Sequence, residues 1–129
     1  MEKIVVCLGS NFGDRRRNVA EALEWIRENL VGVNDSGIYE TPAFGHSGAP
    51  YMNAVVSGDC REEKVADFER ACKEYESSHG RDAEARRNNH VPIDIDIVKA
   101  GNRILRYTDF NCEFFQIGYR MLELPVADN

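Results

Sequence analysis

The sequence lacks the features that would place the protein in a membrane, in a secretory pathway or on nucleic acid. No apolar run approaches the length needed to cross a bilayer. The N-terminus enters a strand-like segment without the layout of a signal peptide. The formal net charge of −6 provides no general basic surface of the kind that binds nucleic acid. We therefore expect a cytoplasmic protein with no membrane or nucleic-acid partner, in which local cations or metal would hold any anionic ligand.

Paired cysteines, repeats and linkers are also missing. The four cysteines form no C-x-x-C pair, and their spacing is not that of a zinc site. Cys7 lies in an apolar strand pattern and Cys72 on an apolar helical face, which is typical of small buried residues in a reducing compartment. With 129 residues, 43% of them hydrophobic and 29% charged, the chain is expected to form one globular domain over residues 1–129.

The hydrophobic pattern predicts the element order β-α-β-β-α-β. One amphipathic helix is expected between an Asp14 N-cap and Gly32, and a second between a capping box of Asp59 with Glu62 and Gly80. This order is that of a ferredoxin-like α+β fold, an antiparallel sheet with two helices on one face and the opposite face open to a ligand. Strands are expected at 4–8, 33–41, 52–57 and 91–98, polar loops at 42–50 and 81–90, and a last short helix at about 114–124.

The segment 91–98 carries the strongest chemical signal. Its apolar residues alternate with Asp94 and Asp96, so the two carboxylates share one strand face. Their Cβ atoms would lie roughly 7 Å apart, and carboxylates that close repel each other unless cations neutralise them. Magnesium fits because it accepts carboxylate oxygens and keeps coordination sites for phosphate. The alternative is a polar face that is paired with arginines or solvated.

A polar loop before this strand contains Arg81, Arg86, Arg87 and His90. The planar fork of arginine suits phosphate oxygens, so beside a metal-binding strand the loop favours a polyphosphate ligand. The alternative is a solvated loop whose arginines pair with acidic neighbours.

A third group combines Thr41, Pro42 and Phe44 with Tyr51 and Asn53. Tyr51 and Asn53 share a strand face, where a ring beside an amide could stack on a flat heterocycle and hydrogen-bond its edge. The alternative is core packing followed by a turn.

Five short motifs carry a family resemblance. They are Gly9-Ser10-Asn11, Tyr39-Glu40-Thr41-Pro42, Tyr51-Met52-Asn53-Ala54, Gly80-Arg81 and Ile93-Asp94-Ile95-Asp96-Ile97. Over about residues 4–124 the chain resembles the 6-hydroxymethyl-7,8-dihydropterin pyrophosphokinases. The resemblance implies a ferredoxin-like monomer that transfers pyrophosphate from ATP to the hydroxymethyl group of a dihydropterin, in folate biosynthesis.

The resemblance also implies roles for individual residues. Asp94 and Asp96 would hold two Mg²⁺ ions that bridge the ATP phosphates, with Arg81 as a further catalytic group. Tyr51 and Tyr119 would stack on opposite faces of the pterin. The pocket around the pterin would be lined by Thr41, Pro42, Phe44 and Asn53. The nucleotide side would include Glu76 and Arg81.

Several positions depart from the family pattern. Val91 and Ile117 stand where the family usually has arginines, a His-Pro-His-type segment is missing, and the stretch 103–112 is shortened. Arg86, Arg87 and His90 are the residues that would compensate, and Arg87 and His90 among them are the candidate nucleotide-binding residues. Two alternatives follow: a catalytically weak or inactive protein that binds pterin or nucleotide, and a phosphotransferase that acts on another flat heterocycle.

Overall fold

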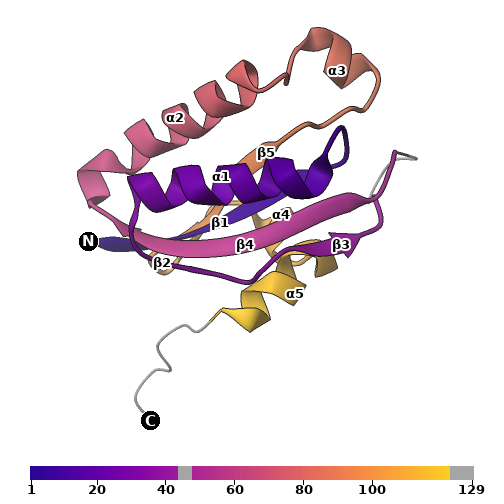
Figure 1. Ribbon diagram of the computed structural model, residues 1–129. Coiled ribbons are helices and arrows are strands. Elements are labelled where there is room, and N and C mark those ends of the chain that lie inside the picture. Colours follow the sequence, from indigo (N-terminus) through magenta and orange to yellow (C-terminus); the bar gives the residue numbers. More distant parts are fainter. Residues whose placement is uncertain (44–47, 123–129) are drawn as a thin grey trace.

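The computed structural model describes residues 1–43 and 48–122, which form one antiparallel sheet with helices on both faces (Figure 1). The sheet order is β2-β4-β1-β5-β6, and β3 also pairs with β4. The strands are β1 (Glu2–Ser10), β2 (Val31–Asp35), β3 (Tyr39–Thr41), β4 (Tyr51–Cys60), β5 (Asp94–Ala100) and β6 (Arg103–Ile104). The helices are α1 (Arg15–Asn29), α2 (Val65–Ser78), α3 (Ala83–Arg87), α4 (Tyr107–Phe110) and α5 (Glu113–Met121), with a 3₁₀ turn at Glu62–Lys64.

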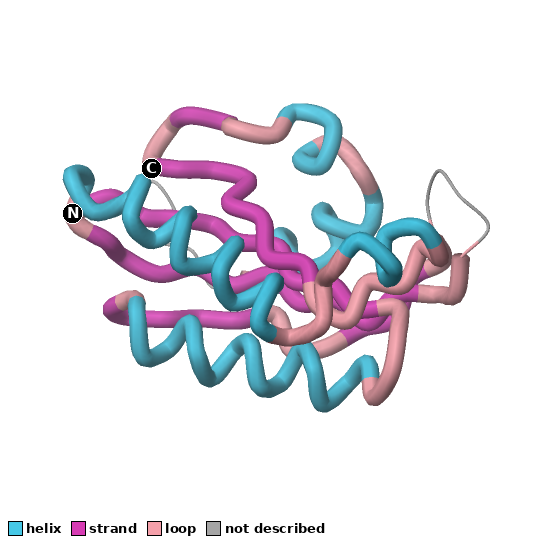
Figure 2. The backbone as a smooth tube through the Cα atoms, turned by 90° about the horizontal axis from the view of Figure 1, so that it is seen from above, coloured by secondary structure: helices cyan, strands magenta, loops and turns pink. Residues whose placement is uncertain are grey.

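Helices α1 and α2 cover one face of the sheet (Figures 1 and 2), as the ferredoxin-like α+β prediction requires. The two helices meet where the Trp25 ring packs against Phe68 and Tyr75, at centroid distances of 5.9 and 4.9 Å. The predicted Asp14 N-cap is confirmed, because its side chain accepts a hydrogen bond from Arg17 N at 3.2 Å. No helix in the described part of the chain is long and apolar enough to span a membrane.

The opposite face is more covered than the sequence predicted, because α4 and α5 pack on part of it (Figure 1). The Tyr39 hydroxyl holds α5 there: it donates to Phe114 O at 2.5 Å and accepts from Gly118 N at 3.1 Å. A Cβ atom at Gly118 would lie 2.6 Å from both Tyr39 Oη and Val55 Cγ2, so glycine is what permits this close approach. The apolar residues buried between this helix and the sheet are Val5, Cys7, Val55, Val98, Phe115 and Leu122.

Three predicted elements differ in the structure. The expected strand 33–41 is two strands, because the chain turns at residues 36–38, where Gly37 has a φ of +80°. The expected loop 81–90 contains α3, capped by Asp82, whose side chain accepts from Ala85 N at 2.8 Å. The capping box of Asp59 with Glu62 is wrong, since β4 continues to Cys60 and Asp59 instead contacts Lys3 at 3.3 Å.

Asn11 explains why the strand predicted at 91–98 begins only at Asp94. The buried Asn11 side chain accepts from Val91 N at 2.6 Å and donates to Asn89 O at 2.9 Å, while its own N donates to Val91 O at 2.9 Å. These bonds occupy the backbone that would otherwise continue the ladder, and they fix the path by which the chain enters β5.

Candidate functional site

A cavity of about 210 Å³ opens on the face of the sheet that carries α5. The register places Gly9 opposite both Asn53 and Asp94, so β1, β4 and β5 turn these positions toward the same face. Six residues named from the sequence come together in its lining: Thr41, Pro42, Tyr51, Asn53, Asp94 and Asp96. Six further lining residues were not predicted as site residues from the sequence: Cys7, Leu8, Gly9, Arg106, Asp109 and Phe114.

On its β4 side the cavity combines an aromatic ring with a buried amide. Asn53 Nδ2 donates to Thr41 Oγ1 at 2.7 Å, and both side chains are nearly inaccessible to solvent. A Cβ atom at Gly9 would lie 3.3 Å from Tyr51 Cδ2, so the glycine lets the Tyr51 ring pack against β1. A flat ligand with a polar edge would find an apolar surface and fixed hydrogen-bonding groups here.

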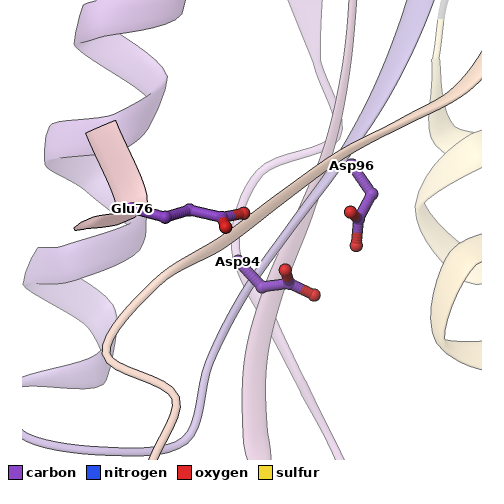
Figure 3. Close-up of side chains that lie close together, drawn as sticks. All are labelled: Glu76, Asp94 and Asp96. Atoms are coloured by element: carbon purple, nitrogen blue, oxygen red, sulfur yellow. The ribbon is translucent and has the colours of Figure 1, made fainter. Parts of the chain in front are cut away.

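On the β5 side of the cavity, Asp94 and Asp96 line the wall and belong to an acidic cluster whose third member, Glu76, lies outside the lining. Glu76 from α2 and Asp94 and Asp96 from β5 each offer a carboxylate oxygen, and these oxygens all lie within 4.8 Å of one another. Figure 3 shows Glu76 reaching toward β5, from which both aspartates project. Carboxylate oxygens at this separation fit a hard cation such as Mg²⁺. Glu76, expected on the nucleotide side, is therefore also a candidate metal ligand.

Two cations contact this cluster directly. Lys73 Nζ lies 3.1 Å from Glu76 Oε2 and 3.0 Å from Asp96 Oδ1. Arg81 Nη1 donates to Asp94 Oδ1 at 2.8 Å and lies 3.8 Å from Glu76 Oε1. The arginine pairing that the sequence left open as an alternative is thus present. A third cation, Arg106, lies farther away, with its Nη1 3.8 Å from Asp96 Oδ1, and it also pairs with Asp109. With Asp109 included, four carboxylates face three cations, which leaves an excess of negative charge that a divalent cation would fit.

The electrostatics of the cavity agree with this excess. Burial raises the pKa of Asp96, Asp94 raises it further, and Lys73 opposes both effects without cancelling them. Burial also raises the pKa of the Cys7 thiol well above its usual value, and Asp94, Asp96 and Asp109 add to that shift. Cys7 therefore contributes a neutral, uncharged surface to the cavity beside an acidic one.

The remaining predicted site residues lie elsewhere. Tyr119 packs against Phe110 and Phe115, and Lys99 Nζ lies 3.1 Å from its hydroxyl. Phe114, from the same helix, lines the cavity instead.

The three candidates for compensating phosphate contacts are also outside the lining. Arg86 and Arg87 are exposed on α3, and His90 stacks on Phe12 at a centroid distance of 4.0 Å. Phe44 lies outside the described residues, so its placement stays a prediction.

The sheet, its covering helices and the acidic cluster beside a cavity define a ferredoxin-like α+β protein with a candidate divalent-metal site. The family model for 7,8-dihydro-6-hydroxymethylpterin-pyrophosphokinase (HPPK) matches residues 5–128, and the chain belongs to this family. The resemblance inferred from the five motifs is thereby confirmed.

Two plant proteins show the same relationship. The chain is 34% identical over 105 residues to the "Folate synthesis bifunctional protein, mitochondrial" of Pisum sativum, a match that covers 78% of this chain and 19% of that protein. It is 31% identical over 102 residues to the "Folate synthesis bifunctional protein" of Arabidopsis thaliana, covering 78% of this chain and 21% of that protein. The chain spans about a fifth of the length of these curated relatives.

Proposed function

We propose that the protein transfers pyrophosphate from Mg-ATP to 6-hydroxymethyl-7,8-dihydropterin, a step in folate biosynthesis. The observation that carries this proposal is that one cavity is lined both by the two aspartates of the acidic cluster and by Tyr51 and Asn53. A phosphate donor held at the first and a flat heterocycle held at the second would meet inside it. Membership of the pterin pyrophosphokinase family supports the same pairing of ligands.

The pterin would occupy the end of the cavity formed by β1 and β4. Tyr51 and Phe114 supply rings to its lining, while Asn53 and Thr41 supply polar groups that are already bonded to each other. Groups that are fixed before binding lose little conformational entropy when a ligand arrives. We therefore propose Phe114, rather than the expected Tyr119, as the aromatic partner of Tyr51.

The nucleotide would be held at the acidic end. Asp94 and Asp96, with Glu76 behind them, would hold the two Mg²⁺ ions, and Arg81 would keep the Asp94 carboxylate in place. Bound Mg²⁺ would neutralise charge on the phosphates. In the reaction the hydroxymethyl oxygen forms a bond to the β-phosphorus, the bond from that phosphorus to the AMP oxygen breaks, and the hydroxyl proton is released. Positioning and charge neutralisation carry such a transfer without a strong base.

The test is AMP formation from Mg-ATP and 6-hydroxymethyl-7,8-dihydropterin. We expect the parent to release AMP and both Asp94→Asn and Asp96→Asn to lose this activity together with Mg²⁺-dependent ATP binding. Asp67→Asn is the matched control, because Asp67 pairs with Arg70 on the exposed side of α2. A parent that forms no AMP at high concentration would rule out the proposal. Variants that bind Mg-ATP like the parent would show that the metal site is elsewhere.

One observation favours a second candidate, a pterin- or nucleotide-binding protein with little catalysis. The lining of the cavity includes none of Arg86, Arg87 and His90, so the residues expected to compensate for the family's missing arginines lie away from the proposed phosphate position. Calorimetry with the pterin would separate the two candidates if no AMP forms. Pterin binding without AMP formation supports the second candidate. A titration that shows no heat of pterin binding argues against any role for the pterin.

We further propose that residues 1–129 act as one domain and as a monomer in the cytoplasm. The family match over residues 5–128 supports one domain. The cysteines Cys7, Cys60, Cys72 and Cys112 are all free, which supports a reducing compartment. Sedimentation at micromolar concentration would test the monomer, and a dimer mass would contradict it.

A further inference from the structure

Arg106 brings a guanidinium group to the cavity wall beside the acidic cluster. Its position follows from the backbone on both sides. Leu105 N and Arg106 N donate to Val98 O at 2.8 and 3.4 Å, which holds this segment against β5. Phe110 N donates to Arg106 O at 2.9 Å, which begins α4. Arg106 therefore lies at a fixed place rather than on an unattached loop.

Asp109 orients the guanidinium. Arg106 Nε donates to Asp109 Oδ2 at 2.5 Å, and Asp109 itself lines the cavity. Arg106 Nη1 lies 3.8 Å from Asp96 Oδ1, which is within ion-pair range but beyond a hydrogen bond. The Asp109 contact engages Nε, so the other end of the planar fork is directed toward Asp96 and the space beside it.

We infer that Arg106 contacts the phosphate oxygens of a Mg²⁺-bound polyphosphate held at Asp94 and Asp96, and that Asp109 is its positioning residue. This inference rests on the proposed function. The guanidinium fork matches phosphate oxygens and forms short, charge-assisted hydrogen bonds with them. Arg106 lies in the segment between β6 and α4. Its positive charge would replace that of the family's arginines, at whose positions this chain has Val91 and Ile117.

The charge of Arg106 gives the inference a signature that a purely structural role would not produce. A guanidinium near Asp96 repels Mg²⁺ alone but attracts a complex of Mg²⁺ with a polyphosphate. Removing the charge should therefore leave the affinity for Mg²⁺ alone equal or higher, and should lower the affinity for the complex. If Arg106 served only to neutralise Asp96 and start α4, its loss would change the two affinities in parallel.

The experiment is calorimetry with Mg²⁺ alone and with Mg²⁺ plus inorganic tripolyphosphate. We expect Arg106→Gln to weaken tripolyphosphate binding about ten- to a hundredfold, the range for one lost charge-assisted contact, without weakening Mg²⁺ binding. Asp109→Asn should give a smaller loss in the same direction, and Arg106→Lys a partial rescue. Arg103→Gln is the control, since Arg103 pairs with Glu2 at 3.2 Å outside the cavity lining.

Retained Mg²⁺ binding by Arg106→Gln shows that the variant is folded. The inference is overturned if this variant binds tripolyphosphate like the parent, if Mg²⁺ and tripolyphosphate binding fall in parallel, or if the parent itself does not bind tripolyphosphate. AMP formation by the parent is measured separately. A parent that forms no AMP but shows the expected pattern would overturn the proposed function and support Arg106 as a polyphosphate ligand.

Discussion

Lys73 contacts two of the three carboxylates of the acidic cluster. Its Nζ contacts Glu76 Oε2, Asp96 Oδ1 and, at 2.9 Å, Ile95 O. We expect Lys73→Met to lower the free energy of unfolding in EDTA by about 1 kcal/mol, a modest loss because the side chain is half exposed. Saturating Mg²⁺ should stabilise this variant more than the parent, since the ion no longer competes with the ammonium group.

Thermal unfolding with and without Mg²⁺ measures both effects. Lys64→Met is the matched control, because Lys64 is on the exposed surface and its ion pair within the described part of the chain is with Asp67, at 4.0 Å. If Lys73→Met and the parent unfold alike in EDTA and gain equally from Mg²⁺, then Lys73 does not balance the cluster.

Cys72 should make the free energy of unfolding depend on pH in the alkaline range. Burial raises the pKa of this thiol from 9.0 to about 12. Above pH 9 the unfolded chain releases the thiol proton before the folded chain does, so the free energy of unfolding falls as pH rises from 9 toward 12, by up to about 1.4 kcal/mol per pH unit. Urea titrations between pH 8 and 10.5 should show this slope in the parent and a shallower one in Cys72→Ala. An unchanged slope would contradict the assignment, and Cys112→Ala, at a partly exposed position, is the control.

Local sequence patterns were sufficient to predict some site residues and not others. The shared face of Asp94 and Asp96 was predictable because side chains alternate along a strand. The shared face of Tyr51 and Asn53 was predictable for the same reason. Arg106 and Phe114 reach the cavity through the path of the chain between β6 and α5, which has no periodic pattern to reveal it. The spacing of three between Arg106 and Asp109 was the available signal, and such pairs are common on exposed helices.

At the scale of elements, the docking of α5 depends on Gly118. Alanine inside a helix usually gains 0.5–1 kcal/mol over glycine. Here its Cβ would meet Tyr39 Oη and Val55 Cγ2 at 2.6 Å, and overpacking of this kind costs about 1–3 kcal/mol. We expect Gly118→Ala to lower the urea midpoint and to weaken pterin binding, because Phe114 moves with the helix.

Arg120→Ala is the control on the exposed side of α5. A Gly118→Ala variant that is more stable than the parent would show that α5 packs less closely than the structure describes.

Element prediction succeeded where a pattern was long and failed where it was short. The apolar faces of α1 and α2 extend over several turns, so the helical spacing identified them. Helix α3 has five residues and no buried one, and its signal, the Asp82 cap, was read as part of a polar loop. The start of β5 was misplaced because Asn11, about 80 residues earlier, takes the hydrogen bonds of Val91. Such a long-range contact leaves no trace in the segment 91–98.

For the whole molecule, stability should be highest in the middle of the sheet. Strand β1 is paired on both sides, with β4 along its whole length and with β5 from Ile4 to Gly9, and apolar clusters cover both faces. Helix α3 has no such cover. We expect hydrogen exchange to be slowest in peptides from β1 and β4, at rates set by global unfolding, and faster by orders of magnitude in peptides from residues 83–90. Equal protection in the two regions would contradict this picture.

The hydrogen bonds that surround Ile95 also have a consequence for self-association. Among the described residues, β5 pairs with β6 at Lys99 and Ala100 and not at residues 94–96, which therefore border a side of the sheet where a strand from a second molecule could add. Glu76 Oε2 accepts from Ile95 N at 2.7 Å and Lys73 Nζ donates to Ile95 O, so side chains of α2 occupy the backbone groups that an incoming strand would need. The residues that would prepare the cluster for a cation thus also protect the protein from edge-to-edge aggregation.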